Sequence, residues 1–222
     1  MIPLKDNVKA ASFPFINYLL IAGNLYGFYR EVTQPNAAAL AAFVREWSLT
    51  PARLLLFPDG AWATIYTSMF LHGGWIHLLG NMLYLWIFGN GVEGRMGHRR
   101  YLLFYLLCGT LAALSQVAVA PSSTGPMVGA SGAIAGVLGA YFLLYPKAKI
   151  LSVVPIWIFL RIVEIPAIFF LGFWFLIQAF QGWGSLGSGA VGGIAWAAHA
   201  GGFLAGGILV LFFKKPELRR KK

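Results

Sequence analysis

Long apolar runs follow one another along this chain with few charged residues between them. The 222-residue sequence is 59% hydrophobic and 11% charged, and its mean hydropathy is +0.71. A soluble domain is about 45–50% apolar and about 25% charged. Runs of roughly 17–25 apolar residues have the length of membrane-spanning helices. The sequence therefore predicts an all-α, multi-pass membrane protein.

Six segments fit this length. They are about 13–29, 66–90, 101–120, 129–146, 165–182 and 194–213. A further apolar piece, Ile150 to Leu160, is too short to cross a bilayer, and we expect it to be an interfacial or re-entrant lead-in to the fifth span. Because the apolar segments are nearly continuous, one compact helical bundle is the simplest organisation.

The net charge of +10 would suit a nucleic-acid partner, but the placement of the basic residues indicates topology instead. With six spans and a cytoplasmic N-terminus, most Lys and Arg residues fall on the cytoplasmic side, as the positive-inside rule requires. Arg161 is expected near the start of the fifth span. Both termini are then cytoplasmic, and no nucleic-acid partner is implied. The cytoplasmic set is Lys5, Lys9, Arg95, Arg99, Arg100, Lys147, Lys149 and the basic tail 214–222.

The outer connections differ in character. The first is long, roughly 30–65, and we expect short helices in it. Asn36 can cap a helix over Ala37–Trp47, and Thr50-Pro51 is typical of a helix start. The connections 121–126 and 181–193 are uncharged and rich in Gly, Ser or Pro. We expect both to be mobile.

A serine and a histidine in the apolar segments are the first candidates for chemistry. Ser131 lies between Gly129 and Gly132 in sequence, and His199 precedes Gly202 and Gly206. Taken alone, such a serine more often packs helices or bonds a carbonyl, and such a histidine can also bind a metal or haem or bond another helix. The small-xxx-small spacing of the two later glycines allows close helix contact. If the two helices meet, His199 can act as the base for a Ser131 nucleophile.

No acidic residue is placed to complete a triad. All seven lie in loops, tails or span ends, so a dyad is the remaining arrangement, with the imidazole held by hydrogen bonding or ring stacking. Cys108 is the only cysteine, so no intrachain disulfide can form. The acidic residues are Asp6, Glu31, Glu46, Asp59, Glu93, Glu164 and Glu217.

The second span supplies further polar groups. His77 and Asn81 are four residues apart and share one face of a helix. With backbone N–H groups at Ala130 and Ser131 they can form an oxyanion hole; spacing alone equally allows simple hydrogen bonds to neighbouring helices. His72 and His77 lie five apart, on different faces, and no His-Glu-x-x-His motif is present. We therefore predict no metal and no organic cofactor, with a histidine-ligated metal or haem protein as a weaker alternative.

Four short motifs in order make the chain resemble the rhomboid family of intramembrane serine proteases. Each lies on a successive apolar segment, and the likeness covers nearly all of the sequence. The motifs are Phe70 to Asn81, Gly89 to Gly97 with Glu93, Gly129-Ala130-Ser131-Gly132, and His199-x-x-Gly202-x-x-x-Gly206.

The resemblance implies one rhomboid-like membrane domain over residues 1–222 with a six-helix core, of the bacterial type and located in a prokaryotic cell membrane. It implies Ser131 as nucleophile, His199 as general base, and His77, Asn81 and the Ser131 N–H as the oxyanion site. The partners implied are transmembrane protein substrates and the lipid bilayer. It also implies that the first outer loop lies partly in the membrane and that the fifth span and loop form a gate and cap.

Two positions depart from the best-known bacterial members. Those carry a tyrosine four residues after the nucleophile, where this chain has Ala135, and Trp-Arg where this chain has Trp62-Ala63. Tyr141 or Trp196 are the candidates to support the His199 ring instead. The alternative function is a non-proteolytic rhomboid-like protein that binds transmembrane clients.

Overall fold

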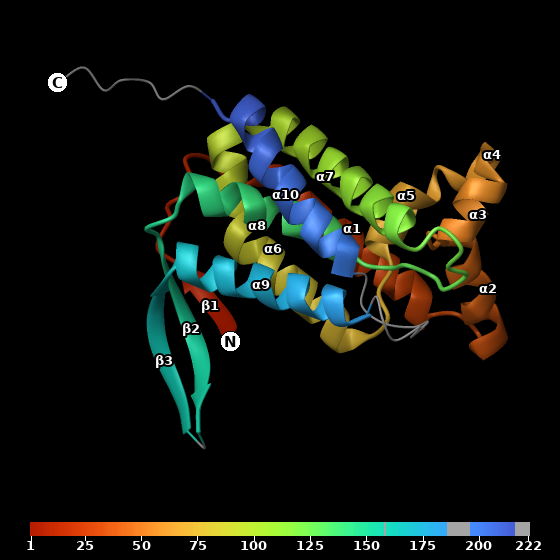
Figure 1. Cartoon of the computed structure of the whole chain (residues 1–222), viewed down its shortest axis with the longest axis horizontal. Coiled ribbons are helices and arrows are strands. Elements are labelled where there is room, and N and C mark those ends of the chain that lie inside the picture. Colours follow the sequence, from red (N-terminus) through yellow and green to blue (C-terminus); the bar gives the residue numbers. More distant parts are fainter. Residues whose placement is uncertain (158, 186–195, 216–222) are drawn as a thin grey trace.

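The computed structural model describes residues 1–157, 159–185 and 196–215. It is a bundle of helices with a small three-stranded sheet at one end (Figure 1). The helices are α1 (Phe15–Val32), α2 (Ala37–Trp47), α3 (Pro51–Leu56), α4 (Pro58–Ala61), α5 (Thr64–Thr67), the 3₁₀ turn η1 (Ser68–Phe70), α6 (Trp75–Met96), α7 (His98–Val119), α8 (Ser131–Leu144), α9 (Ala167–Ser185) and α10 (Trp196–Phe213). The strands are β1 (Ile2–Asp6), β2 (Lys149–Ile156) and β3 (Phe159–Pro166).

Helix α8 lies at the centre of the bundle. Its residues 133–141 are all buried, and it packs on α6, α7 and α10. Small residues make the α8–α10 contact close: a Cβ atom at Gly202 would overlap the carbonyl oxygen of Gly132, and one at Gly206 would overlap the backbone of Gly136. Because both helices lack side chains along this line, their backbones touch.

The long first connection folds as short helices, as predicted. Asn36 begins α2, and its side-chain oxygen accepts a hydrogen bond from the N–H of Ala39 at 2.9 Å. Pro51 occupies the first turn of α3, where its missing N–H costs nothing. In Figure 1 these helices gather at one end of the bundle, away from the sheet.

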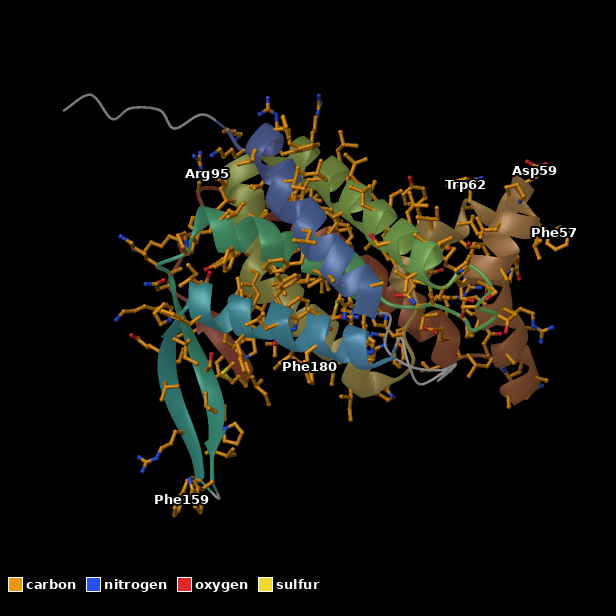
Figure 2. The ribbon with its side chains drawn as sticks, in the orientation of Figure 1. Phe57, Asp59, Trp62, Arg95, Phe159 and Phe180 are labelled. Carbon is orange, nitrogen blue, oxygen red and sulfur yellow. The ribbon has the colours of Figure 1, made fainter. Side chains whose placement is uncertain are left out.

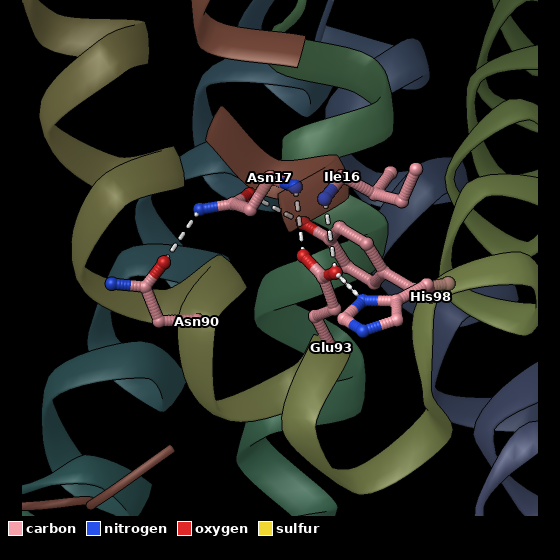
Figure 3. A network of polar contacts seen from close by, with 6 residues as sticks. Ile16, Asn17, Asn90, Glu93 and His98 are labelled. Carbon is pink, nitrogen blue, oxygen red and sulfur yellow. Dashed lines mark hydrogen bonds and ion pairs between the residues drawn. The ribbon is translucent and has the colours of Figure 1, made fainter. Parts of the chain in front are cut away.

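A buried carboxylate ties α1 to α6. Glu93, fully buried on α6, accepts hydrogen bonds from the backbone N–H groups of Ile16 and Asn17 at 3.0 and 2.7 Å (Figure 3). These N–H groups start α1 and have no intrahelical partner. The Asn17 side chain continues the network to Asn90 and to the Tyr101 hydroxyl. This network fixes the start of α1 against the end of α6.

Basic residues from separate connections meet at this same end. Arg95 donates to the carbonyl of Lys215, and the N–H of Lys215 donates to the carbonyl of Arg95. The N–H of Lys149 bonds the Asn7 side chain. We call this end of the molecule, where α6, α8 and α10 terminate, the basic end. Its composition agrees with the positive-inside pattern in the sequence.

The prediction of an all-α chain is wrong for residues 2–6, 149–156 and 159–166. These form an antiparallel sheet of order β1-β2-β3, and a long β2–β3 hairpin projects from the basic end (Figure 1). The segment expected to be an interfacial or re-entrant lead-in thus consists of two strands, and Arg161 lies in β3 rather than at the start of a span. The physical reason is the run of β-branched residues on both sides of Trp157, which favours extended backbone.

Helix bounds differ from the predicted spans by several residues. The second span begins at Trp75 instead of 66, because η1 and an extended segment precede it, and the fifth begins at Ala167. Among the described residues, α7 and α10 are long and apolar enough to cross a membrane, while α8 and residues 167–180 form shorter apolar helices. The expected mobile segment 181–193 and the tail 214–222 fall largely outside the described residues.

Candidate active site

Ser131 is the first residue of α8, at the end of the bundle opposite the basic end. The N–H groups in the first turn of a helix have no intrahelical partner. Ala130, which precedes α8, supplies no side-chain cap for them. Gly129 adopts φ 120°, a conformation that L side chains rarely take, and its N–H donates to the Ser68 carbonyl at 2.9 Å. The chain thus presents Ser131 on a tight turn at a helix N-terminus, where negative charge is favoured.

His199 reaches Ser131 across the α8–α10 contact. It lies in the first turn of α10 and is 9% exposed. Its Nε2 is 2.7 Å from the Ser131 Oγ. The close glycine contact at Gly202 and Gly206 places the two helices near enough for this hydrogen bond. Sixty-eight residues of chain separate the pair, so tertiary packing alone creates it.

His77 and Asn81 face the same turn from α6. A Cβ atom on Gly129 would lie 2.8 Å from the His77 Nε2 and 3.5 Å from the Asn81 Nδ2. The Gly73 N–H donates to the His77 Nδ1 at 3.3 Å. A ring nitrogen that accepts carries no proton, so the proton of the neutral ring is on Nε2. Both side chains therefore turn a donor toward the backbone beside Ser131.

The Asn81 amide is a buried donor without a partner. Its Nδ2 is enclosed and has no hydrogen-bond partner within the described part of the chain. A buried unpaired donor costs roughly 1–3 kcal/mol, and such a group calls for an explanation. The side chain lines a cavity, so an oxygen that enters this cavity can accept the bond.

That cavity has a volume of about 640 Å³. His77, Asn81, Ser131, His199 and Gln178 supply polar groups to its wall, and mostly apolar side chains of α6, α8, α9, α10 and the loop 126–128 line the rest. The structure thus brings the four predicted polar residues together around one space. A cavity with a few convergent polar groups and mostly apolar walls is typical of a substrate site.

The His199 ring contacts one of its two predicted supports, Trp196, and also two side chains of α9 that were not predicted. Its Nδ1 lies 2.6 Å from the Gln178 Oε1 on α9, and the Trp174 ring lies 6.0 Å away, tilted by 37°. Trp196 meets the ring edge-on at 6.2 Å. Tyr141 is wrong as a candidate, because its hydroxyl bonds the Asp6 carboxyl at the basic end.

Sequence reasoning missed Gln178 and Trp174. Only acidic residues were considered as partners for the His199 ring, so an amide was overlooked. Gln178 is nevertheless a polar side chain within an apolar stretch. Its spacing of four from Trp174 puts both on one helix face. That pattern was the available signal.

The remaining histidines do not converge on a metal. His72 lies beside His77, with ring centroids 5.1 Å apart, and the backbone N–H of His72 donates to the buried Glu31 carboxylate at 2.8 Å. Within residues 1–157, 159–185 and 196–215, no three His, Cys, Asp or Glu side chains are grouped to hold a metal ion.

Comparison with known proteins identifies relatives. The family model described as "Rhomboid domain" matches residues 59–216. The Rhomboid protease GluP of Bacillus subtilis is 34% identical over 194 residues, covering 85% of this chain and 35% of that protein. The mitochondrial Rhomboid protein 1 of Saccharomyces cerevisiae is 32% identical over 164 residues, covering 72% of this chain and 44% of that protein. The chain thus spans less than half the length of these curated relatives.

Proposed function

The chain belongs to the rhomboid family, and we propose that it is an intramembrane serine endopeptidase that uses a Ser131–His199 dyad. The observation that carries the proposal is the 2.7 Å contact between the His199 Nε2 and the Ser131 Oγ at the wall of a cavity. We further propose that residues 1–222 form one six-span membrane domain in a prokaryotic inner membrane, with cytoplasmic termini. The gathering of basic residues at one end of the bundle supports this orientation.

In the proposed mechanism, His199 accepts the Ser131 hydroxyl proton through Nε2 as Oγ attacks the scissile carbonyl. The same imidazole then gives this proton to the leaving amine. Water enters for the second half of the reaction and hydrolyses the acyl-enzyme in the same manner. Each proton passes through one nitrogen, so Nδ1 keeps its hydrogen throughout.

The developing oxyanion has three sources of stabilisation. His77 Nε2 and Asn81 Nδ2 supply side-chain donors next to Gly129, and the N–H groups of Ala130, just before α8, and of Ser131, its first residue, supply backbone donors. Each preorganised donor of this kind lowers the barrier by about 3–4 kcal/mol. The unpaired Asn81 Nδ2 supports the assignment, since the substrate oxygen would satisfy it.

The expected substrates are transmembrane segments. A helix hides its carbonyl groups in hydrogen bonds, so cleavage should favour segments with helix-weakening residues near the scissile bond. Equal cleavage of a stably helical segment and of its Gly- or Pro-containing variant would contradict this preference.

The decisive experiment compares cleavage of a model transmembrane substrate by the wild type, Ser131→Ala and His199→Ala in reconstituted membranes. We expect both variants to lose cleavage at least a thousandfold, because the two residues act as a unit. Retained cleavage in Ser131→Ala would overturn the mechanism. Substrate binding without cleavage by the folded wild type would favour the alternative, a rhomboid-like protein that binds transmembrane clients.

A further inference from the structure

Gln178 lies on the far side of His199 from Ser131. One ring nitrogen meets the serine at 2.7 Å and the other meets the Gln178 amide oxygen at 2.6 Å. The imidazole is therefore bonded at both ends, and its orientation is defined by two helices, α8 and α9. Chymotrypsin-type sites place a carboxylate at the second position, whereas here a neutral amide occupies it.

From this geometry we propose that Gln178 is a positioning residue that holds His199 in the tautomer required for catalysis. An amide oxygen only accepts hydrogen bonds. Nδ1 must then carry the proton, which leaves Nε2 free to take the one from Ser131. The inference rests on the proposed function.

Two side chains of α9 together replace the tyrosine that is absent at Ala135. Trp174, one turn before Gln178, places its ring beside the imidazole, and Ala135 itself is fully buried in α8. In most of its length α9 turns large apolar side chains outward, including Phe180 at the lower side of the helix in Figure 2. Base orientation thus depends on α9 remaining packed against α10, and displacement of α9 would release the ring.

The test uses three variants of the full chain on α9. Gln178→Met removes the acceptor and should lower kcat by ~10–100-fold, the usual effect of losing a partner that orients a histidine, with KM little changed. Gln178→Glu keeps an acceptor at the same position and should restore kcat to within a few-fold of the wild type. Phe180→Leu, exposed on the same helix, is the matched control and should behave as the wild type.

Two outcomes would overturn the inference. One is a Gln178→Met enzyme with wild-type kcat. The other is a Gln178→Glu enzyme as slow as Gln178→Met when both unfold at the wild-type temperature, since the hydrogen bond would then not matter. A wild type without Ser131-dependent cleavage would instead refute the proposed function, so the two failures are distinguishable.

An independent observation concerns the β2–β3 hairpin. Its outer half exposes large apolar side chains on both faces: Leu160 is 74% exposed on one face of β3 and Phe159 63% on the other, and Trp157 in the turn is 97% exposed. Figure 2 shows Phe159 at the tip, far from the helices. Trp157 has φ 57°, a turn conformation that usually selects Gly or Asn. A hairpin surrounded by water does not normally expose large apolar side chains at its tip.

The surroundings of the hairpin indicate what covers it. It leaves the bundle at the basic end and runs across the direction of α9 (Figure 1), so in a bilayer it extends sideways along the surface. Arg161 lies in its exposed half, and the one acid in either strand, Glu164, pairs with Lys149 at 2.8 Å. β3 is a sheet edge with unpaired backbone groups, which excludes the hydrocarbon core. We infer that the hairpin lies in the headgroup layer, where tryptophan is favoured and basic residues meet anionic lipid.

A single accessible thiol tests this placement. Cys108 is the only cysteine and is buried, so Trp157→Cys can be labelled with an environment-sensitive fluorophore in nanodiscs of phosphatidylcholine and phosphatidylglycerol. We expect blue-shifted emission that is quenched by lipids with a spin label near the headgroup. Ser122→Cys, exposed in the polar turn after α7, provides a reference for a solvated label.

The placement would be overturned if labelled Trp157→Cys emitted at the same wavelength as labelled Ser122→Cys and were not quenched by the spin-labelled lipids. Disulfide-linked dimers of unlabelled Trp157→Cys would also overturn it, in favour of pairing between the β3 edges of two copies. Neither result depends on proteolysis, so this inference stands or falls separately from the proposed function.

Discussion

The two sides of His199 are built differently. On one side, α6, α8 and α10 pack closely, with backbone against backbone at Gly202 and Gly206, and they carry Ser131 and the proposed oxyanion donors. On the other side, α9 presents Gln178 and Trp174 but leaves most of its apolar surface exposed. The proposed reacting groups thus lie on the closely packed side, and only the orientation of the His199 ring depends on the less covered helix. The following predictions test this division, in order of decreasing effect.

The largest effect is expected on the closely packed side. Asn81→Ala removes a donor that has no partner among the described residues, so kcat should fall by ~10²–10³-fold while the unfolding temperature stays near that of the wild type. Asn90→Ala, on the same helix, removes an acceptor for Asn17 and should give the opposite pattern. Kinetics and thermal unfolding of both variants in detergent check this. Equal activity loss in both would remove Asn81 from the oxyanion site.

The glycine contact gives the next effect. Gly206→Ala forces a Cβ atom into the Gly136 backbone, and overpacking of this kind costs about 1–3 kcal/mol. The neighbouring Gly207→Ala would meet only Leu143 and Gly139 at ordinary contact distances of 3.7 and 3.9 Å, and should be neutral. Thermal unfolding of the pair measures the difference. Equal stability of both variants would mean that the α8–α10 contact is not close.

A smaller effect is expected on α9. Trp174→Ala removes the ring beside His199, and an aromatic contact of this type contributes about 0.5–1.5 kcal/mol. The rate should therefore fall only a few-fold, and Trp174→Phe should recover most of it. If Trp174→Ala were slower than Gln178→Met, ring stacking rather than the hydrogen bond would orient the base.

The smallest effect on activity is expected for Tyr141→Phe, because its hydroxyl bonds Asp6 and not His199. Stability should fall by about 1 kcal/mol. Burial raises the pKa of the Asp6 carboxyl, and the Tyr141 hydrogen bond partly lowers it. A raised pKa means that stability declines as pH rises through it, so the deficit of the variant should be larger at neutral than at acidic pH. Thermal unfolding of both proteins at neutral and acidic pH checks whether the stability difference changes in this direction. A loss of activity in Tyr141→Phe would instead indicate that Tyr141 acts at the candidate active site.

Much of the fold could be predicted from the sequence because the length and apolar composition of a segment indicate a membrane helix. The helix starting after Asn36 was predicted with its cap, and the pairing of His77 with Asn81 on one face followed from helical periodicity. The hairpin was missed since a short apolar run does not distinguish strand from helix. The sheet partner β1, near the N-terminus, gives no local indication of where it pairs.

The sequence by itself determined which residues are present: apolar segments, a serine and a histidine in two of them, and charges that gather at the basic end. Local periodicity and composition encode these, so they can be read without the fold. Only the tertiary structure decided that the His199 ring contacts Gln178 and Trp174 of α9, while the Tyr141 hydroxyl bonds Asp6. Such contacts depend on how helices distant in sequence are rotated and spaced, which no local pattern specifies.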